Sequence, residues 1–291
     1  MSTHAISHTR HERNPVQRLK LASVFAALLL GLAPGGATLA QQTPTPAPLV
    51  IPPGPVSHFP TRFDVVDAPN QFDRVLMIID FPSGAWTPSH APGGYLYVTV
   101  IDGEVSTRTV GAPGHEDTYP AGSAFTANPG EYLELGNAST ANARVIATAL
   151  LPKGAPLTID QAGFSSDAYS GPTDGYNVLD SVARAPRPTT VYHSSIAVER
   201  PAGAFELVHV VLDLDPGTWT PQHIHGGQEL VIVTAGELTL QRRGDVQTFA
   251  PGESWVNTGG VVHAAGNDGR SFAQVVATFL LPAGRPLTTV V

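Results

Sequence analysis

Hydrophobic residues in this chain of 291 residues occur mostly in short runs separated by turn-forming residues. Examples are residues 75–79, 95–101, 207–214 and 230–234, in which β-branched side chains dominate and glycine, proline, asparagine or aspartate bounds each run. Runs of this length and composition are typical of β-strands. The chain also contains 29 glycines and 27 prolines, which limit the length of any helix. The pattern therefore predicts an all-β fold with many short antiparallel strands.

The strand pattern occurs twice, because the chain contains a tandem repeat. The segment GAWTPSH at 84–90 returns 133 positions later as GTWTPQH at 217–223. Further on, LLPKGAPLT at 150–158 returns 130 positions later as LLPAGRPLT at 280–288. A repeat of this kind is the strongest indication of the architecture that a sequence can give. It predicts two copies of one domain, each a many-stranded antiparallel sandwich or barrel.

The repeat divides the chain into domains and connecting segments. Proline-rich sequence before the first copy favours an extended tether, and a stretch rich in glycine and proline between the copies favours an irregular connector. The predicted boundaries are 1–40 for a signal peptide, 41–55 for the tether, 56–163 for the first domain, 164–188 for the connector and 189–291 for the second domain.

The first 40 residues have the form of a secretory signal peptide. Basic residues from Arg10 to Lys20 precede the apolar run 21–33. The sequence Thr-Leu-Ala at residues 38–40 is typical of a cleavage site, so cleavage is expected after Ala40. The alternative is a membrane anchor, but the run is shorter than the ~20 apolar residues that a spanning helix needs. We therefore expect a periplasmic or secreted protein with no membrane span after cleavage.

Charge and cysteine content narrow the possible functions. The formal net charge is −8, and removal of a basic leader makes the mature chain more acidic, so nucleic acid is not an expected partner. Without any cysteine, disulfides, thiol catalysis and thiolate metal sites are excluded. We expect a small-molecule ligand or substrate, and a monomer or homodimer.

Three histidines and a glutamate in the second copy form a candidate metal site. His223 and His225 are two residues apart in an extended segment, so their side chains lie on one face. A Gly-Gly pair then lets the chain turn, and Glu229 opens the next apolar run. His263 follows after another glycine pair. Three imidazoles and one carboxylate suit a first-row transition metal with positions left open for water or substrate.

The spacing of these residues resembles the two sequence motifs of the cupin superfamily. Residues 217–236 read G-x5-H-x-H-x3-E-x6-G, as the first cupin motif does. Residues 252–267 read G-x5-T-x-G-x2-H-x3-N, which matches the second motif except that Thr258 replaces a proline. The resemblance covers the second copy and implies two tandem double-stranded β-helix barrels of the Cupin_2 type. It also implies that His223, His225, Glu229 and His263 bind one divalent metal ion.

The first copy has lost most of the implied ligands. At the four aligned positions it contains His90, Pro92, Leu96 and Leu133. Proline and leucine offer no ligand atom, so the first barrel is predicted to be metal-free. Its interior is then either filled by these apolar side chains or kept as an apolar pocket.

A comparison of the two copies also separates scaffold residues from candidate substrate residues. Features that both copies keep, such as the paired tryptophans Trp86 and Trp219, are interpreted as scaffold. Residues specific to the second copy are candidates for contact with a substrate, and they are His209, Gln228, Trp255, Gln274 and Phe279.

The leading functional hypothesis is a metal-dependent enzyme that resembles quercetin dioxygenase-type bicupins. The metal, which could be copper, iron, manganese, nickel or zinc, would bind substrate oxygens, with Glu229 as both ligand and catalytic proton acceptor. Cupin decarboxylases and isomerases stay open, although oxalate decarboxylation needs a cation beside the metal, and only Arg242 and Arg243 could fold back to supply it. A periplasmic small-molecule-binding protein without turnover is the alternative from a different class.

Overall fold

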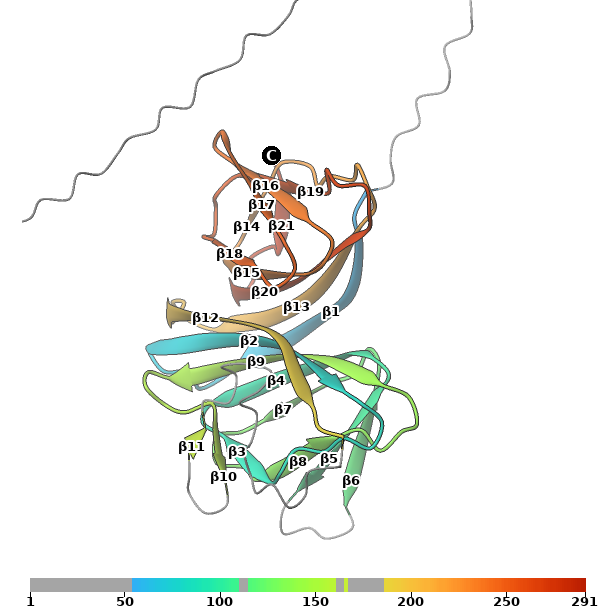
Figure 1. The fold of residues 1–291 in the computed structure, drawn as a ribbon. Coiled ribbons are helices and arrows are strands. Elements are labelled where there is room, and N and C mark those ends of the chain that lie inside the picture. Colours follow the sequence, from blue (N-terminus) through green and yellow to red (C-terminus); the bar gives the residue numbers. More distant parts are fainter. Residues whose placement is uncertain (1–53, 110–114, 161–164, 167–185) are drawn as a thin grey trace, which may run out of the picture. The chain divides into compact units, whose positions relative to one another are not determined.

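The structure is a computed structural model in which residues 54–109, 115–160, 165–166 and 186–291 are described. Every regular element in these ranges is a β-strand, and all strand pairs are antiparallel (Figure 1). This confirms the all-β prediction. In the described ranges there is accordingly no helix of the length and apolar character that crossing a membrane requires. The predicted signal peptide, and most of the tether and connector, lie outside the described residues.

The first barrel consists of two facing antiparallel sheets. One sheet has the order β12-β2-β9-β4-β7 and the other β11-β10-β3-β8-β5-β6. The strands are β2 (Gln71–Phe81), β3 (His90–Pro92), β4 (Tyr95–Asp102), β5 (Glu104–Thr109), β6 (Glu116–Pro120), β7 (Ala124–Ala127), β8 (Leu133–Gly136), β9 (Ala143–Pro152), β10 (Thr158–Asp160), β11 (Ser165–Ser166) and β12 (Thr189–Glu199).

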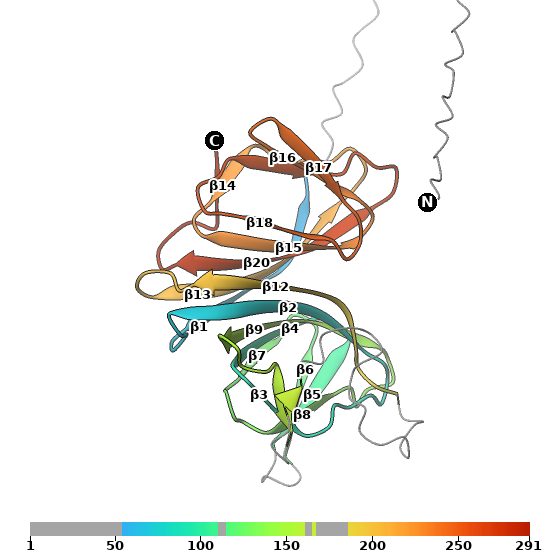
Figure 2. The same cartoon turned by 60° about the vertical axis from the view of Figure 1, so that its left-hand side comes forward.

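The second barrel repeats this arrangement (Figure 2). Its sheets have the orders β1-β13-β20-β15-β18 and β17-β16-β19-β14-β21. The strands are β1 (Val56–Val65), β13 (Phe205–Leu214), β14 (His223–His225), β15 (Gln228–Ala235), β16 (Leu238–Arg242), β17 (Asp245–Phe249), β18 (Ser254–Asn257), β19 (His263–Gly266), β20 (Ala273–Pro282) and β21 (Thr288–Val290). The fold is therefore two double-stranded β-helix barrels in tandem.

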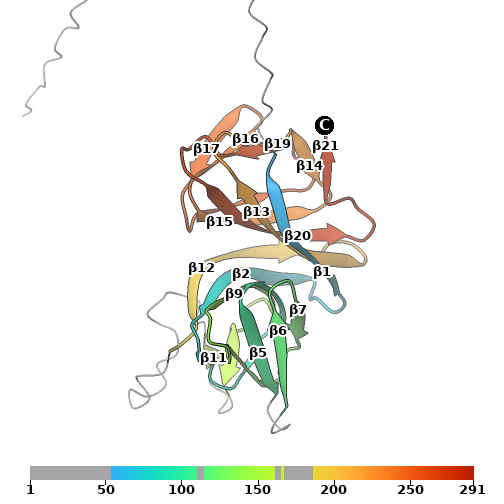
Figure 3. The same cartoon turned by 90° about the vertical axis from the view of Figure 1, so that its right-hand side faces the viewer.

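The two barrels exchange their first strands. β1 precedes the first repeat but pairs with β13 of the second barrel, and Figure 3 shows it in blue beside the orange strands. In return, β12 precedes the second repeat but pairs with β2 of the first barrel. The sheets therefore depart from the predicted division into 56–163 and 189–291 at the first strand of each range. Each exchanged strand covers an edge that β2 or β13 would otherwise leave unpaired.

The sheets that receive the exchanged strands pack against each other. One buried cluster contains Leu76 and Ile78 of β2 together with Leu230 and Ile232 of β15. Because residues i and i+2 of a strand point to the same side, these alternate positions bury one face of each sheet between the barrels. The opposite faces of the same sheets line the two barrel interiors.

The repeated tryptophans have equivalent positions in the two barrels. Trp86 lies over Gly136 and Trp219 over Gly266, where a Cβ atom on the glycine would come within 2.1 and 2.0 Å of the indole ring. Only glycine allows this close approach. The contact supports the interpretation of both tryptophans as scaffold.

Candidate metal centre

Three neighbouring strands of the second barrel supply the candidate ligands. His223 and His225 are the ends of β14, and both are buried while the residue between them is only half-buried. His263 begins β19 and lies directly opposite His223 in the strand register. The alternation along β14 and the pairing with β19 therefore bring the three imidazoles together.

A tight turn brings Glu229 to the same point. At Gly227 a Cβ atom would lie 1.9 Å from the carbonyl oxygen of Leu280, so only glycine fits between β14 and β15. The chain reverses there and places Glu229 as the second residue of β15. Its carboxylate faces the histidines, with Oε1 at 3.5 Å from Nε2 of His225 and Oε2 at 3.7 Å from Nε2 of His263.

The four side chains form one compact buried cluster. The histidine ligand atoms all lie within 4.8 Å of one another, and the Nε2 atoms of His223 and His225 are 3.2 Å apart. Each of the four residues is at most 7% exposed. The predicted ligands are thus brought together.

Backbone carbonyl groups determine the orientation of the three rings. Nδ1 of each histidine lies within hydrogen-bond distance of a backbone oxygen, at 2.8, 2.8 and 2.9 Å for His223, His225 and His263 respectively. A neutral ring that donates through Nδ1 carries a lone pair on Nε2. Three such lone pairs converge beside a carboxylate, and two acceptors 3.2 Å apart cannot hydrogen-bond to each other. A divalent cation satisfies all four groups, so the residues fit a metal site.

Burial favours the neutral form of the histidines. It lowers the pKa of His225 to about 4, and it also lowers the pKa of His263. Neutral imidazole is the form that binds a metal ion. Burial raises the pKa of Glu229, while its hydrogen bond from Asn257 and the adjacent histidines act in the opposite direction.

A short hydrogen-bonded chain behind the cluster holds the carboxylate. Nδ2 of Asn257 donates to Oε2 of Glu229 at 2.6 Å. Nη1 of Arg242 donates to Oδ1 of the same asparagine at 3.3 Å and to the backbone oxygen of Val256 at 3.0 Å. Arg242 therefore reaches the site through Asn257 and does not line the cavity beside the ligands.

Sequence reasoning missed Asn257, although a signal was present. Asn257 pairs with Glu229 across β15 and β18, and the equivalent pair in the first barrel is Ala127 with Leu96. The asparagine is thus specific to the second copy, like the ligand it contacts. Only the strand register reveals that the two substitutions belong together.

A cavity of about 280 Å³ opens beside the four candidate ligands. Most of its remaining wall is apolar. The aliphatic side chains that contribute are Val210, Leu212, Val231, Leu238, Ala265, Val275 and Ala277. Among the residues that line it there is no lysine or arginine. The volume and the lining suit a small ligand that is mainly apolar.

Two of the five predicted substrate residues lie near the candidate ligands. Trp255 lines the cavity. Phe279 is buried with its ring centroid 4.8 Å from that of His225, so it packs against a ligand and is not itself part of the cavity wall.

The other three are engaged elsewhere, which corrects their prediction as substrate contacts. His209 is fully buried between the barrels, and Gln228 accepts a hydrogen bond from Arg74 of the first barrel at 3.2 Å. Gln274 bonds to Asp213 and Thr234, both at 2.9 Å. His209 and Gln228 are specific to the second copy because they contact the other barrel, whereas Gln274 bonds within its own barrel.

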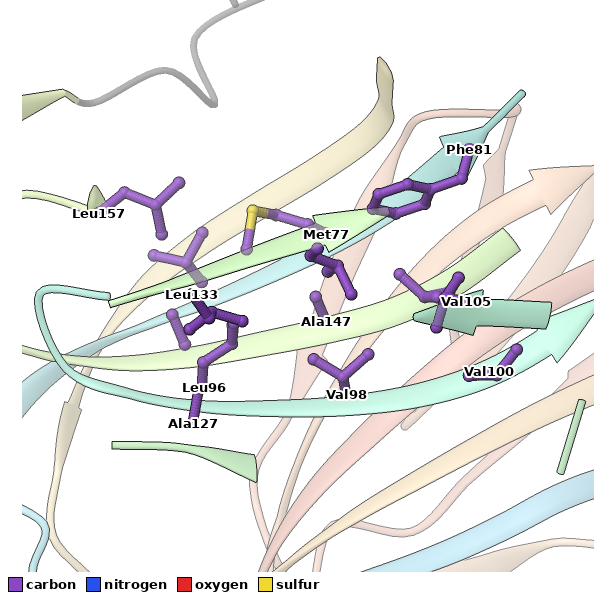
Figure 4. Close-up of a cluster of buried hydrophobic side chains, with 14 of the residues drawn as sticks. Met77, Phe81, Leu96, Val98, Val100, Val105, Ala127, Leu133, Ala147 and Leu157 are labelled. Atoms are coloured by element: carbon purple, nitrogen blue, oxygen red, sulfur yellow. The ribbon is translucent and has the colours of Figure 1, made fainter. Parts of the chain in front are cut away.

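The interior of the first barrel is filled by apolar side chains. Leu96 and Leu133, which replace two ligands, belong to one buried cluster with Met77 and Leu157 (Figure 4). His90 keeps the contact of its Nδ1 to a backbone oxygen, at 2.8 Å. Of the two possibilities left open by the sequence, a filled interior or an apolar pocket, the packing of these side chains favours the first.

Comparisons with known proteins agree with this architecture. Residues 210–279 match the Cupin_2 family, described as a cupin domain. The chain is similar to the crystal structure of vicilin from Solanum lycopersicum (tomato), with 13% sequence identity, a TM-score of 0.52 and coverage of 75% of this chain and 77% of that chain. It is also similar to the crystal structure of the 7S globulin of Momordica charantia, with 12% sequence identity and a TM-score of 0.50. That match covers 79% of this chain and 84% of the globulin chain. Comparison with curated proteins gives no match.

The fold and the matched domain define the class of this protein. The chain has the fold of two double-stranded β-helix barrels, and the second barrel, which contains the candidate ligands, is the one that matches the cupin domain family. Identities of 12–13% relate these proteins in fold alone. Dioxygenase activity therefore stays a prediction.

Proposed function

We propose that the second barrel binds one divalent transition metal ion through His223, His225, Glu229 and His263, and that the protein is a dioxygenase-like oxidoreductase acting on a small organic substrate. The observation that carries this proposal is the convergence of three histidine rings and a carboxylate in the wall of a largely apolar cavity. A bound ion there would supply open coordination positions for the oxygen atoms of substrate and dioxygen.

The protein residues have distinct tasks in this proposal. The aliphatic wall excludes water and holds the apolar body of the substrate. Glu229 is placed to accept the proton that a substrate hydroxyl releases, because its carboxylate borders the cavity. Asn257 keeps that carboxylate oriented.

Metal analysis tests the first half of the proposal. The full chain, purified without chelators, should contain about one transition metal ion, and His225→Ala and His263→Ala should each abolish retention of the metal. His90→Ala, at the aligned position of the first barrel, is the matched control and should keep it. A wild-type protein that neither contains nor takes up copper, iron, manganese, nickel or zinc would refute the proposal.

Oxygen uptake tests the second half. Wild-type protein should consume dioxygen with a member of a panel of phenolic and enediol compounds, and Glu229→Gln should lose this activity even in preparations in which it is fully metal-loaded. Saturable binding of panel compounds without product would instead identify a small-molecule-binding cupin. Release of carbon dioxide, or isomerisation without oxygen uptake, would identify a decarboxylase or isomerase.

We further propose that the protein is exported. Basic residues followed by a short apolar run and the Thr-Leu-Ala sequence ending at Ala40 support this proposal. Mass spectrometry of the mature protein should find Gln41 at its N-terminus. Recovery of the uncleaved chain from the cytoplasm of the native cell would contradict it.

A further inference from the structure

Arg74 is a buried cation of the first barrel without an acidic partner. It lies on β2, it is fully buried, and among the described residues it forms no ion pair. Burial lowers the pKa of Arg74 to about 9, while the charge of Glu229 acts in the opposite direction, so the side chain stays charged at neutral pH. Burial of a charge without an ionic partner is costly, and packing alone does not account for an arginine at this position.

The guanidinium group bridges β15 and β20 of the second barrel directly behind Glu229. Nη1 donates to the backbone oxygens of Gln228 and Thr278 at 3.5 and 3.4 Å, and Nη2 donates to the side-chain oxygen of Gln228 at 3.2 Å. In the strand register Glu229 pairs with Phe279, and Gln228 and Thr278 are their neighbours on the two strands. Because side chains alternate along a strand, Gln228 faces the first barrel and Glu229 faces the interior of the second.

The contact runs in one direction only. The position aligned with Arg74 in the second copy is Leu207, and the position aligned with Gln228 in the first copy is Tyr95. Leu207 belongs to a buried apolar cluster, and Tyr95 packs against it. The barrel without the candidate ligands therefore supplies the arginine, and the barrel that contains them receives it.

We propose that Arg74 is a positioning residue for Glu229, and that the first barrel supports the metal centre of the second barrel through it. The contacts to Gln228 and Thr278 hold the start of β15 against β20, where the chain leaves the glycine turn, and so keep the carboxylate beside the histidines. The positive charge behind the strand adds to this effect, because charges interact more strongly in a buried site than in water. This inference rests on the proposed metal site.

Cobalt(II) binding tests the inference, because the visible spectrum of the ion depends on the number and arrangement of its ligands. The full chain is titrated with cobalt(II) as wild type, Arg74→Met and Glu229→Gln. Arg74→Met keeps a long side chain but removes the charge and all the donors. It should bind cobalt(II) about 10-fold more weakly than wild type, with a spectrum shifted towards that of Glu229→Gln.

A milder variant covers the case in which Arg74→Met does not fold. Arg74→Lys keeps the charge but lacks the planar fork that reaches both strands, so a loss of affinity of about 3-fold is expected. Wild-type affinity and a wild-type spectrum in Arg74→Lys would then overturn the proposal.

His209→Gln is the matched control, because it alters another buried polar contact between the barrels, the one to Thr99 and Thr148. It should keep the affinity and the spectrum of wild type. An equal loss in His209→Gln and Arg74→Met would assign the effect to the contact between the barrels in general and would overturn the role of Arg74. Wild-type binding by folded Arg74→Met would overturn it as well. Failure of the wild type to bind cobalt(II) would refute the metal centre itself, and the inference with it.

Discussion

Asn257 is the residue on which the orientation of Glu229 depends. Its amide nitrogen donates to the carboxylate at 2.6 Å, and its amide oxygen accepts from Arg242 at 3.3 Å. The arrangement has only one consistent orientation of the amide, because a guanidinium can only donate and an ionised carboxylate can only accept. The arginine thus holds the asparagine, and the asparagine holds the candidate ligand.

Replacement of Asn257 by alanine should weaken metal binding. Loss of an outer hydrogen-bond partner of a metal ligand typically lowers affinity by about 10- to 100-fold, so we expect a loss in this range for Asn257→Ala. Competition with a chelator of known affinity measures it. Gln247→Ala, on an exposed strand of the same barrel, should leave the affinity unchanged. Equal affinities in wild type and Asn257→Ala would remove the residue from the site.

At the scale of elements, the tight turn before β15 is common to both barrels. A Cβ atom at Gly227 would lie 1.9 Å from the carbonyl oxygen of Leu280, and one at Gly94 would lie 2.1 Å from that of Leu150. The first barrel therefore keeps the turn that would bring a carboxylate into place, but it presents a leucine there. The loss of the metal site in that barrel comes from its side chains, because the backbone is retained.

A methyl group at the turn should destabilise the second barrel. Gly227→Ala forces β15 away from β20, and overpacking of this kind costs about 1–3 kcal/mol. Urea unfolding of the metal-free chain measures the change in unfolding free energy. Gly54→Ala is the matched control, because a Cβ atom there meets nothing within 4 Å. A wild-type unfolding curve for Gly227→Ala would contradict the close approach.

At the scale of the whole molecule, each barrel sends a basic side chain into the other. Arg74 of β2 donates to the side-chain oxygen of Gln228 at 3.2 Å, and it is fully buried. In the opposite direction, the ring nitrogens of His209 on β13 form hydrogen bonds with the hydroxyl groups of Thr99 and Thr148 at 3.0 and 2.9 Å. Any displacement of the barrels would leave buried polar groups unpaired, so these bonds favour a single arrangement of the two barrels.

The buried histidine should make stability depend on pH. Burial, and secondarily the charge of Arg74, lowers the pKa of His209 to about 3. Below its unfolded pKa of about 6.5 the unfolded chain takes up a proton that the folded chain does not, so stability falls as pH decreases from about 6.5 towards 3. From about pH 7 to pH 5 this one group should account for about 2 kcal/mol of the loss.

A glutamine at position 209 isolates this contribution. His209→Gln keeps a hydrogen-bonding side chain but cannot titrate, so its unfolding free energy should fall about 2 kcal/mol less than that of wild type between about pH 7 and pH 5. Urea unfolding of metal-free protein at both pH values measures the difference. The ligands His225 and His263 act in the same direction in both proteins and cancel in the comparison. Parallel losses in the two proteins would show that His209 is not buried in neutral form.

Much of the fold and of the candidate site was predictable from local sequence. Alternation along a strand places His223 and His225 on one side of it. The tandem repeat predicts that the chain contains two copies of the domain around them. The same comparison of copies was misleading for His209 and Gln228. A residue specific to one copy can serve the site or the contact between the copies, and sequence alone does not distinguish the two.

The sequence by itself therefore determined the all-β class, the duplication and the candidate ligand set, because these follow from short-range periodicity and spacing. Only the tertiary structure decided the exchange of β1 and β12, the pairing of Asn257 with Glu229 and the burial of Arg74 and His209 between the barrels. Each of these depends on which distant strand lies alongside which. That choice is made by the burial of sheet faces and the pairing of sheet edges across the whole molecule.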